Sequence, residues 1–502
     1  MNKEKEWLNI ILVGSNPMPC YVQAAHLMDK AGWTEEEKES LFVPNRHLLI
    51  HTKETAIYQE RICSALKSLI SENHFRQCEI ESVCLQTADG GSGGEVSQYV
   101  VEQKIKEILE TKNPEGVILN NTGGTKVMTT YAAIALRKWC SKNHRPGAEC
   151  YLSEGRMNCF LFNEQYGKKY LEFPIANVSL AVKDIVRLHG MEICEDKSEN
   201  ELTKELLEDE DFCRRIKRIA ARIFSGSDSD IFSGEYLRLK AFLTDMCNSE
   251  YASYFKSLTY KNGLDNNGAD SNIGESCEFI SPDKARRFEQ YTALLEQYNK
   301  KNRWLCFDAA EDRFKSEGED GGSDMSDLLN QARAKGLDCW KLFMEDWFYY
   351  YICCAVREAF SALRKDYEAI FPAESKFGAD IMYRPWVEDD NGGRQFDILF
   401  STGYQLTVLS ITGGEQGGSV KMNFFEALYQ SEKIGGSRSR VVLISRFTNR
   451  NTQKTYEKEF EAFRKDLDSF VSKQYHQAAI FGQEEVKDYG RLVEALTEDM
   501  KK

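Results

Sequence analysis

Short apolar runs alternate with segments of helical periodicity along the first 185 residues. The apolar runs predict six strands, at residues 8–13, 47–51, 80–86, 116–119, 149–152 and 157–161. Helical spacing between several of them predicts helices at residues 20–30, 55–72, 95–111 and 125–140. Strands that alternate with helices in this way form a parallel sheet that is covered on both faces. The pattern predicts a doubly wound α/β domain over residues 1–185.

The pattern changes after this domain. Residues 186–335 are highly charged, and they predict a mostly helical connector with loops at 261–276 and 316–326, which are rich in Gly, Asp and Ser. Residues 336–365 are apolar on all sides and predict a buried helix. Strands are predicted beyond it at 378–384, 395–401, 404–411 and 441–445, with a helix at 423–433. A second α/β domain is therefore expected over residues 336–502.

Bulk composition limits the classes of partner and compartment. A chain of 502 residues has room for two or three domains, and its net charge of −14 gives no general affinity for polyanions. A nucleic-acid partner would be met in a local groove. The 15 cysteines form no CxxC pair, which favours reduced thiols in the cytoplasm. No apolar run approaches the roughly 18 residues of a membrane span. We expect a soluble, cytoplasmic protein without a membrane partner.

The polar turn that follows the strand at 116–119 carries candidate chemistry. Gly123 and Gly124 allow backbone N–H groups to approach an anion closely, and the start of the next helix points further N–H groups the same way. Thr122 and Thr125 add hydroxyl groups, and Lys126 adds a positive charge. A plain helix cap with a tight turn is the simpler alternative. The spacing of a P-loop or a dinucleotide-binding loop is absent, so the turn indicates a different anionic ligand.

The run from Asn121 to Met128, NTGGTKVM, resembles the second ligand motif of CARF domains, the Rossmann-like cyclic-oligoadenylate sensors of type III CRISPR ancillary effectors. The strand at residues 7–13 is followed by Gly14-Ser15-Asn16-Pro17, the place of the family's first ligand loop. The resemblance implies a homodimer that binds a cyclic oligoadenylate as its activator. The ligand-binding residues that it implies are Ser15, Asn16, Asn121, Thr122, Gly123, Gly124, Thr125 and Lys126.

The order of elements after residue 336 is that of a restriction-endonuclease-like, PD-(D/E)XK core. Asp397 lies where such a core carries a metal-binding carboxylate, and Glu345 lies on the preceding helix, where a further carboxylate often stands. The two would hold Mg²⁺ or Mn²⁺. The segment resembles CARF-linked nucleases through Trp340 with Glu345, through Phe396 with Asp397, and through residues 424–440.

The usual acidic-x-Lys position departs from this pattern, because it reads Ser410-Ile411-Thr412. A hydroxyl at Thr412 cannot replace an ammonium group. Lys421, nine residues later at the start of the next helix, could supply one from a neighbouring element. The alternative is a solvated residue at the helix start, and the sequence does not separate the two.

Three classes of function compete. A metal-dependent nuclease that is activated by a cyclic oligoadenylate and cleaves DNA or RNA explains both halves of the chain. A degenerate effector, which would act through a partner-binding surface, better explains Ser410 and Thr412. A HEPN ribonuclease is disfavoured because it needs RxxxxH, and His476 has Val471 in the arginine position.

Overall fold

The structure is a computed structural model of the whole chain. It describes residues 6–29, 33, 35–40, 43–73, 78–85, 96–153, 156–163, 167–175, 178–225, 236, 238–240, 292, 295, 305–308, 311, 313–316, 322–370, 379–389, 392–412, 417–436, 438–446, 461–462, 464–465 and 478–501. The expected loop at 261–276, part of the one at 316–326, and His476 lie outside these residues.

The N-terminal half is built on a seven-stranded sheet of order β3-β2-β1-β4-β5-β6-β7. Its strands are β1 (Trp7–Leu12), β2 (Arg46–His51), β3 (Glu79–Cys84), β4 (Gly116–Asn120), β5 (Gly147–Ser153), β6 (Arg156–Asn163) and β7 (Gly167–Pro174). Strands β1 to β5 run parallel, and β6 and β7 add an antiparallel edge. All six predicted strands are present. The sequence analysis missed β7, whose exposed edge position leaves few buried apolar residues to reveal it.

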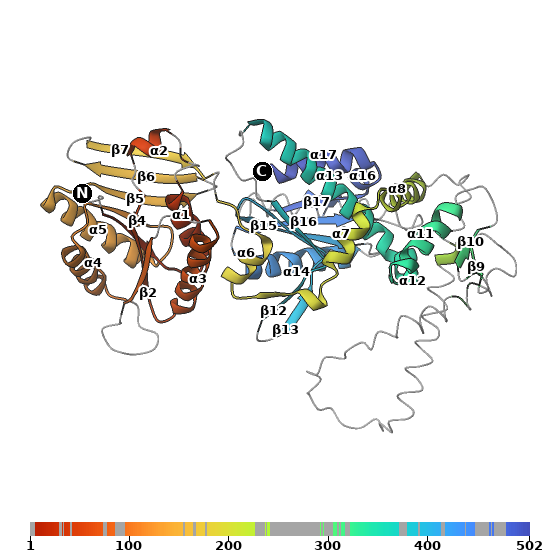
Figure 1. Cartoon of the computed structure of the whole chain (residues 1–502), viewed down its shortest axis with the longest axis horizontal. Helices are drawn as coiled ribbons and strands as arrows, with labels where there is room; N and C mark the ends of the chain where they lie inside the picture. Colours follow the sequence, from red (N-terminus) through yellow and green to blue (C-terminus); the bar gives the residue numbers. More distant parts are fainter. Residues whose placement is uncertain are drawn as a thin grey trace, which may run out of the picture.

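Helices cover both faces of this sheet, which confirms the doubly wound, Rossmann-like α/β fold (Figure 1). Helices α1 (Met18–Met28) and α3 (Ala56–Asn73) pack on one face, and α4 (Gln98–Lys112) and α5 (Lys126–Asn143) pack on the other. The short α2 (Glu35–Ser40) follows α1. Alternation along β1 divides the two cores, because Ile11 faces α1 and α3 while Ile10 faces α4 and α5.

A second, mixed sheet of order β11-β14-β15-β16-β17 forms the C-terminal half. Its strands are β11 (Ala379–Tyr383), β14 (Ile398–Thr402), β15 (Gln405–Thr412), β16 (Arg440–Ser445) and β17 (Ala478–Phe481). Strands β11, β14 and β15 are antiparallel neighbours, whereas β15, β16 and β17 are parallel. The four strands that the sequence predicted here are present, and β17 is an addition.

Helices also cover both faces of the second sheet. Helix α13 (Trp347–Ile370) is the predicted buried helix, and it packs on one face with α17 (Tyr489–Met500), which follows the short α16 (Gln483–Val486). Helix α14 (Gly417–Gly435) packs on the opposite face through Val420 and Phe424. Within the described parts of the chain, no helix is both long and apolar enough to span a membrane.

The described part of the predicted connector does not stand apart from the C-terminal half. Helices α7 (Asn200–Glu208), α8 (Glu210–Ser225) and α11 (Gly322–Ala334) share one apolar core with α13. The remaining elements are η2 (Glu195–Lys197), β9 (Cys306–Asp308), β10 (Arg313–Lys315), α12 (Cys339–Lys341) and η3 (Leu342–Asp346). Strand β8 (Glu192–Cys194) pairs with β12 (Trp386–Asp389), which also pairs with β13 (Gly392–Gln395). Helices α7, α8 and α11 are amphipathic, and they bury their apolar sides by joining the C-terminal core.

The two halves meet along α6 (Val182–Leu188) and the residues that precede it (Figure 1). Leu180 N–H donates to Gly403 O at 2.9 Å, and Ser401 Oγ donates to Leu180 O at 2.7 Å. The Asp380 carboxylate accepts from the Val182 N–H at 3.0 Å at the start of the helix. The apolar core of the N-terminal half also continues through α6 onto residues of β14 and β15. The halves therefore form one packed unit.

Candidate functional site

Two loops of the N-terminal half meet where the strand order of the sheet reverses. Strands β1 and β4 are neighbours, and β2 and β5 flank them on opposite sides. The loops that leave the carboxyl ends of β1 and β4 run directly into the N-termini of α1 and α5. Open α/β sheets bind ligands in the crevice at such a switch point, and helix N-termini favour anions there.

Glycines bring these two loops into backbone contact. A Cβ atom at Gly123 would lie 2.1 Å from Leu12 O, and one at Gly14 would lie 2.9 Å from Gly124 N. Gly124 has a φ of +75°, in the left-handed region that favours glycine. No other residue type fits Gly123 without moving the loops apart.

Side chains fix the shape of the second loop. Asn120 Oδ1 accepts from the Thr122 N–H at 2.9 Å, and Thr125 Oγ1 caps α5 by accepting from the Met128 N–H at 3.2 Å. Thr122 Oγ1 accepts from the Leu152 N–H on β5 at 2.8 Å. Because this hydroxyl oxygen accepts in the bond to Leu152, its own proton remains available for a ligand.

The structure brings all eight predicted ligand residues to this one place. Ser15, Thr125 and Lys126 are exposed, whereas Gly123 is buried. Asn16 Oδ1 accepts from the Met18 N–H at 3.1 Å, which orders the first loop at the start of α1. Exposed hydroxyl groups, a lysine and two helix N-termini make an environment suited to phosphate.

A buried polar network beneath the loops was not found from the sequence. The Asn9 side chain on β1 exchanges two hydrogen bonds with Gln23 of α1, at 3.0 and 3.2 Å. Asn9 Nδ2 also lies 2.9 Å from His47 Nδ1, and Asn120 Nδ2 donates to Gln23 Oε1 at 3.3 Å. Burial lowers the pKa of His47 to about 3, so its imidazole is neutral and can serve as an acceptor. The network ties β1, β2, β4 and α1 together below the crevice. The feature of the sequence that could have indicated this network is Asn9, a polar residue within the apolar run of β1.

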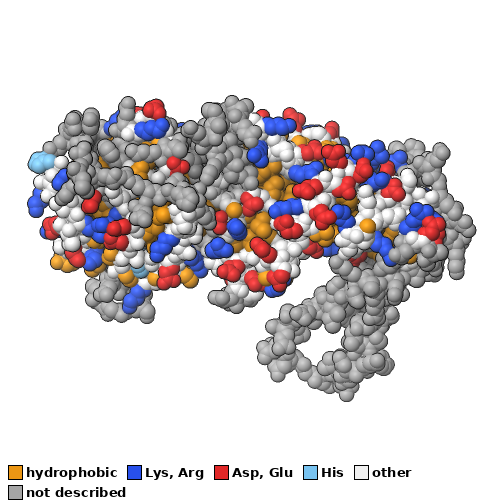
Figure 2. Space-filling view, in the orientation of Figure 1, with side chains coloured by type: hydrophobic (Ala, Val, Ile, Leu, Met, Phe, Trp, Pro, Cys, Tyr) orange, Lys and Arg blue, Asp and Glu red, His pale blue; other side chains and the backbone are white. Residues whose placement is uncertain are grey.

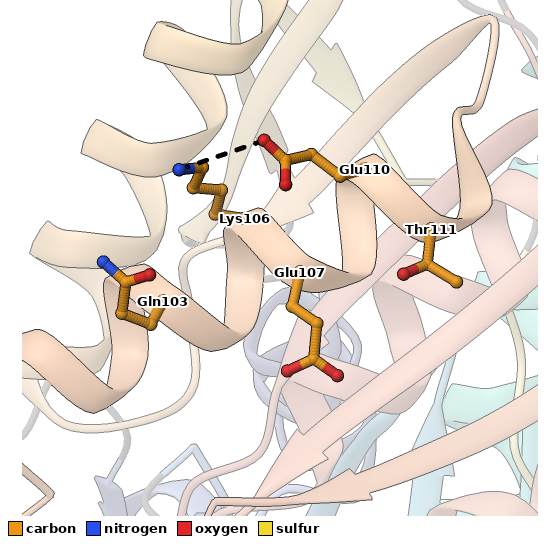
Figure 3. A pocket seen from close by; sticks show the side chains of 5 residues that line it. All are labelled: Gln103, Lys106, Glu107, Glu110 and Thr111. Carbon is orange, nitrogen blue, oxygen red and sulfur yellow. Dashed lines mark ion pairs between the residues drawn. The ribbon is translucent and has the colours of Figure 1, made fainter.

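A shallow hollow on α4 lies away from this crevice. Figure 3 shows the side chains that line it, Gln103, Lys106, Glu107, Glu110 and Thr111. They all come from one helix, and Lys106 Nζ lies 4.0 Å from a Glu110 carboxylate oxygen. The C-terminal end of α4 leads into the first residue of β4, so the hollow is near the amino edge of the sheet. We assign no function to it.

In the C-terminal half, Asp397 lies just before β14, and its side chain is tied to β15. The carboxylate Oδ2 accepts from the Ile411 N–H at 2.7 Å. The pairing of Ile398 with Leu409 brings Asp397, which comes just before β14, to the part of β15 that holds Ser410 and Ile411. Burial raises the pKa of Asp397, whereas the Ile411 N–H and the positive charge of Arg384 oppose that rise.

The acidic residue that faces Asp397 from the helical side is Asp346, and Glu345 is exposed. Asp346 Oδ2 accepts from Arg384 Nη1 at 3.0 Å, and the same nitrogen donates to Glu199 at 2.7 Å. The Arg384 N–H donates to Asp397 O at 2.9 Å, so the cluster adjoins the candidate catalytic carboxylate. The structure places Glu345 at an exposed position, so its role beside Asp397 stays a prediction, and Asp346, which binds Arg384, was not considered from the sequence.

A π-helical turn over Leu342–Asp346 accounts for this difference. Such a turn contains one residue more than an α-helical turn, so the residues that follow are rotated on the helix surface. Because no sequence pattern marked the extra residue, α-helical spacing could not place Asp346 inward.

Lys421 is exposed on α14. Asn423, two residues later, donates from Nδ2 to Thr412 Oγ1 at 3.2 Å. Two residues correspond to about 200° around an α-helix, so Lys421 lies on nearly the opposite side from the side chain that reaches Thr412. In this conformation Lys421 does not face the end of β15.

The described residues contain no group of three or more His, Cys, Asp or Glu side chains that could hold a metal ion. Asp397 with the neighbouring Ser410 hydroxyl offers hard oxygen donors, and one carboxylate is sufficient for a hydrated Mg²⁺ that also binds substrate phosphate. The Asp397 carboxylate therefore fits a hydrated Mg²⁺ or Mn²⁺ ion.

The fold is similar to that of known structures. Protein VC1899 from Vibrio cholerae superposes with a TM-score of 0.51 at 12% identity, over 98% of each chain. Can2 from Sulfobacillus thermosulfidooxidans, solved in complex with cyclic tetra-adenylate, gives a TM-score of 0.48 at 13% identity, over 97% of this chain and 96% of Can2. The likeness to VC1899 is one of fold. No protein-family model and no curated protein sequence matches the chain.

We predict that Gly123→Ala lowers the free energy of unfolding by about 1–3 kcal/mol, because the new methyl group would overlap Leu12 O. Denaturant unfolding of the full chain measures the change. The matched control is Gly490→Ala in α17, where the nearest atom to the new Cβ would be 3.5 Å away. That helical substitution should stabilise by about 0.4–1 kcal/mol. Equal stability of Gly123→Ala and the wild type would disprove the close contact.

Proposed function

We propose that the chain is a cyclic-oligoadenylate sensor joined to an effector domain, and that it acts in type III CRISPR defence. The supporting observation is the convergence of the two motif-bearing loops at the switch point between β1 and β4. A cyclic oligoadenylate presents phosphates in a ring, and the crevice offers hydroxyl groups, Lys126 and two helix N-termini. The motif from Asn121 to Met128 narrows the anion to this class.

The ligand in this proposal lies across a two-fold axis between two copies of the chain. A ring with repeated phosphates can offer the same face to two identical loops, which is the symmetry of an isologous dimer. Ser15, Thr125 and Lys126 are exposed and so accessible to a ligand shared with a second copy.

For the C-terminal domain we propose a metal-dependent endonuclease that acts on DNA or RNA. Support comes from the order α13, β11, β14, β15, α14 and β16, and from Asp397 near Ser410 and Ile411 of β15. Bound Mg²⁺ or Mn²⁺ would supply Lewis-acid activation of a phosphoryl oxygen and of water. Asp397 would hold the ion, and the Ile411 N–H orients the carboxylate. On the face seen in Figure 2, acidic and basic side chains are interspersed, so substrate would be held locally.

A non-cleaving effector is the second candidate. Two observations favour it, namely the hydroxyl of Thr412 where an ammonium group is usual and the outward position of Lys421. In that case ligand binding would alter a surface that a partner recognises, and Asp397 would serve only to order β15 through the Ile411 N–H.

The sensor proposal predicts that one cyclic oligoadenylate binds per two chains. Isothermal titration calorimetry with cyclic tri-, tetra- and hexa-adenylate measures affinity and stoichiometry. Thr122→Ala and Lys126→Ala should each weaken binding by about tenfold, the value of one charge-assisted hydrogen bond. Lys142→Ala, near the other end of α5, is the control and should bind as the wild type does. If no ring binds the wild type, the sensor function is wrong.

The nuclease proposal predicts that Asp397→Asn abolishes cleavage but preserves the fold. The amide oxygen can still accept from the Ile411 N–H, and removal of a poorly solvated charge should leave the melting temperature unchanged or raised. Metal-dependent cleavage of DNA and RNA and thermal melting are measured in parallel. Glu345→Gln, at the exposed neighbouring position, should cleave as the wild type does. Full activity of Asp397→Asn would exclude this site.

The outward position of Lys421 predicts that Lys421→Ala does not reduce cleavage by an active enzyme. Thr412→Lys tests the usual position of the ammonium group, one residue after Ile411, whose N–H binds the Asp397 carboxylate. If the effector lacks only the ammonium group, Thr412→Lys should give it metal-dependent cleavage. A loss of cleavage in Lys421→Ala would mean that α14 rearranges when ligand or substrate binds.

A further inference from the structure

The carboxyl end of β5 connects the ligand loop to the C-terminal half. Strand β4 ends opposite Cys150, whereas β5 continues to Ser153. Leu152 therefore has an N–H and a C=O beyond the reach of β4. The N–H donates to Thr122 Oγ1 at 2.8 Å, and the C=O accepts from Arg438 Nη2 at 2.8 Å. A ligand-loop residue and a C-terminal arginine are thus bound to the same residue.

A second contact joins the first ligand loop to the same C-terminal segment. Gly436 has a φ of +75° and packs against the Asn16 amide and the His189 imidazole. A Cβ atom at Gly436 would lie 2.7 Å from His189 Nε2 and 3.2 Å from Asn16 Oδ1. The first ligand loop therefore touches the turn between α14 and β16 directly, and the second loop reaches it through Leu152.

This turn is also bound to the strand that leads to Asp397. Gln405 Nε2, at the start of β15, donates to Arg438 O at 3.2 Å. Strand β15 pairs with β14 on one side and β16 on the other, so its eight residues span about 26 Å as a stiff element. At its far end, the Ile411 N–H donates to Asp397 Oδ2. A displacement of Arg438 has a continuous route to the candidate catalytic carboxylate.

The region where Leu152 contacts the second ligand loop and Arg438 contains buried polar groups that can gain hydrogen bonds. Asn121 Oδ1 is buried and has no hydrogen-bond partner within the described parts of the chain, whereas Arg438 Nη1 is buried in a guanidinium that also interacts with the Tyr404 hydroxyl. The Asn121 N–H donates to Cys150 O, two residues before the Leu152 carbonyl on the same strand edge. Asn121 Oδ1 is an acceptor, so a rearranged loop that brings a donor to it would be favoured.

We propose that Arg438 is a positioning residue that transmits the state of the ligand loop to β15 and β16. The proposal rests on the cyclic-oligoadenylate sensor function. Binding at the loop holding Asn121 and Thr122 changes the Leu152 edge, Arg438 follows that edge, and Gln405 carries the change into β15. The coupling acts on the C-terminal sheet whether the effector cleaves nucleic acid or only changes its surface.

The test compares Arg438→Ala, Arg438→Lys and Gln405→Ala with the wild type as full-length chains. The control is Arg491→Ala, which removes an exposed arginine from α17. Synthetic cyclic tri-, tetra- and hexa-adenylate serve as probes. Calorimetry measures binding, and hydrogen–deuterium exchange of residues 405–412 and 440–445 with and without the ring measures the response.

We expect binding of the ring to change the hydrogen–deuterium exchange rates of these strands by about 5- to 150-fold, in the wild type and in Arg491→Ala alike. Arg438→Ala and Gln405→Ala should still bind the ring but lose that change, and Arg438→Lys should restore part of it. If Arg438 had only a structural role, its substitution would alter the exchange rates of these backbone amides equally with and without the ring. An undiminished response in both Arg438→Ala and Gln405→Ala would overturn the coupling and leave the sensor function intact. Failure of every ring to bind the wild type would overturn both.

Discussion

The backbone contact between the two loops at the switch point is the constraint on which the N-terminal half depends. Gly123 approaches Leu12 O so closely that no side chain fits, and this approach places the N-termini of α1 and α5 beside one crevice. The buried hydrogen bonds among Asn9, Gln23 and Asn120 hold the strands below it. This close packing orders both loops without any ligand.

The C-terminal site follows a different principle, in which charge is compensated inside the protein. Arg384 neutralises Asp346 and also contacts Glu199, while its guanidinium lies 4.0 Å from the ring centroid of Tyr349. Asp397 lies within the field of this cluster, but its carboxylate is bound directly only by the Ile411 N–H among the hydrogen bonds described. Asp397 is therefore the acidic group of this region whose carboxylate is not paired with Arg384.

Continuous packing joins the two halves of the molecule. The apolar core around α6 extends from the first sheet to the second, and the turn at Gly436 and Arg438 touches the first ligand loop and Leu152 of β5. Packed elements with few voids move as units rather than deforming gradually. Small displacements of the ligand loops can therefore be transmitted to β15, although these loops and Asp397 belong to different sheets.

The sequence by itself determined the elements and the local chemistry of the loops. The alternation of apolar runs and helical spacing predicted most strands and helices of both halves, though not β7, β17 or α17, because these patterns depend on near neighbours. Residues 121–126 were identified as ligand-binding candidates for the same reason, since they lie together in the chain.

Only the tertiary structure decided that the described connector helices join the C-terminal core and that Asp346 faces inward. It also set the outward position of Lys421 and the contact between Arg438 and Leu152. That contact joins residues 286 positions apart, and the side that Asp346 faces depends on one extra residue in a helical turn. Such features arise from long-range packing and helix phase, which no local pattern of residues encodes.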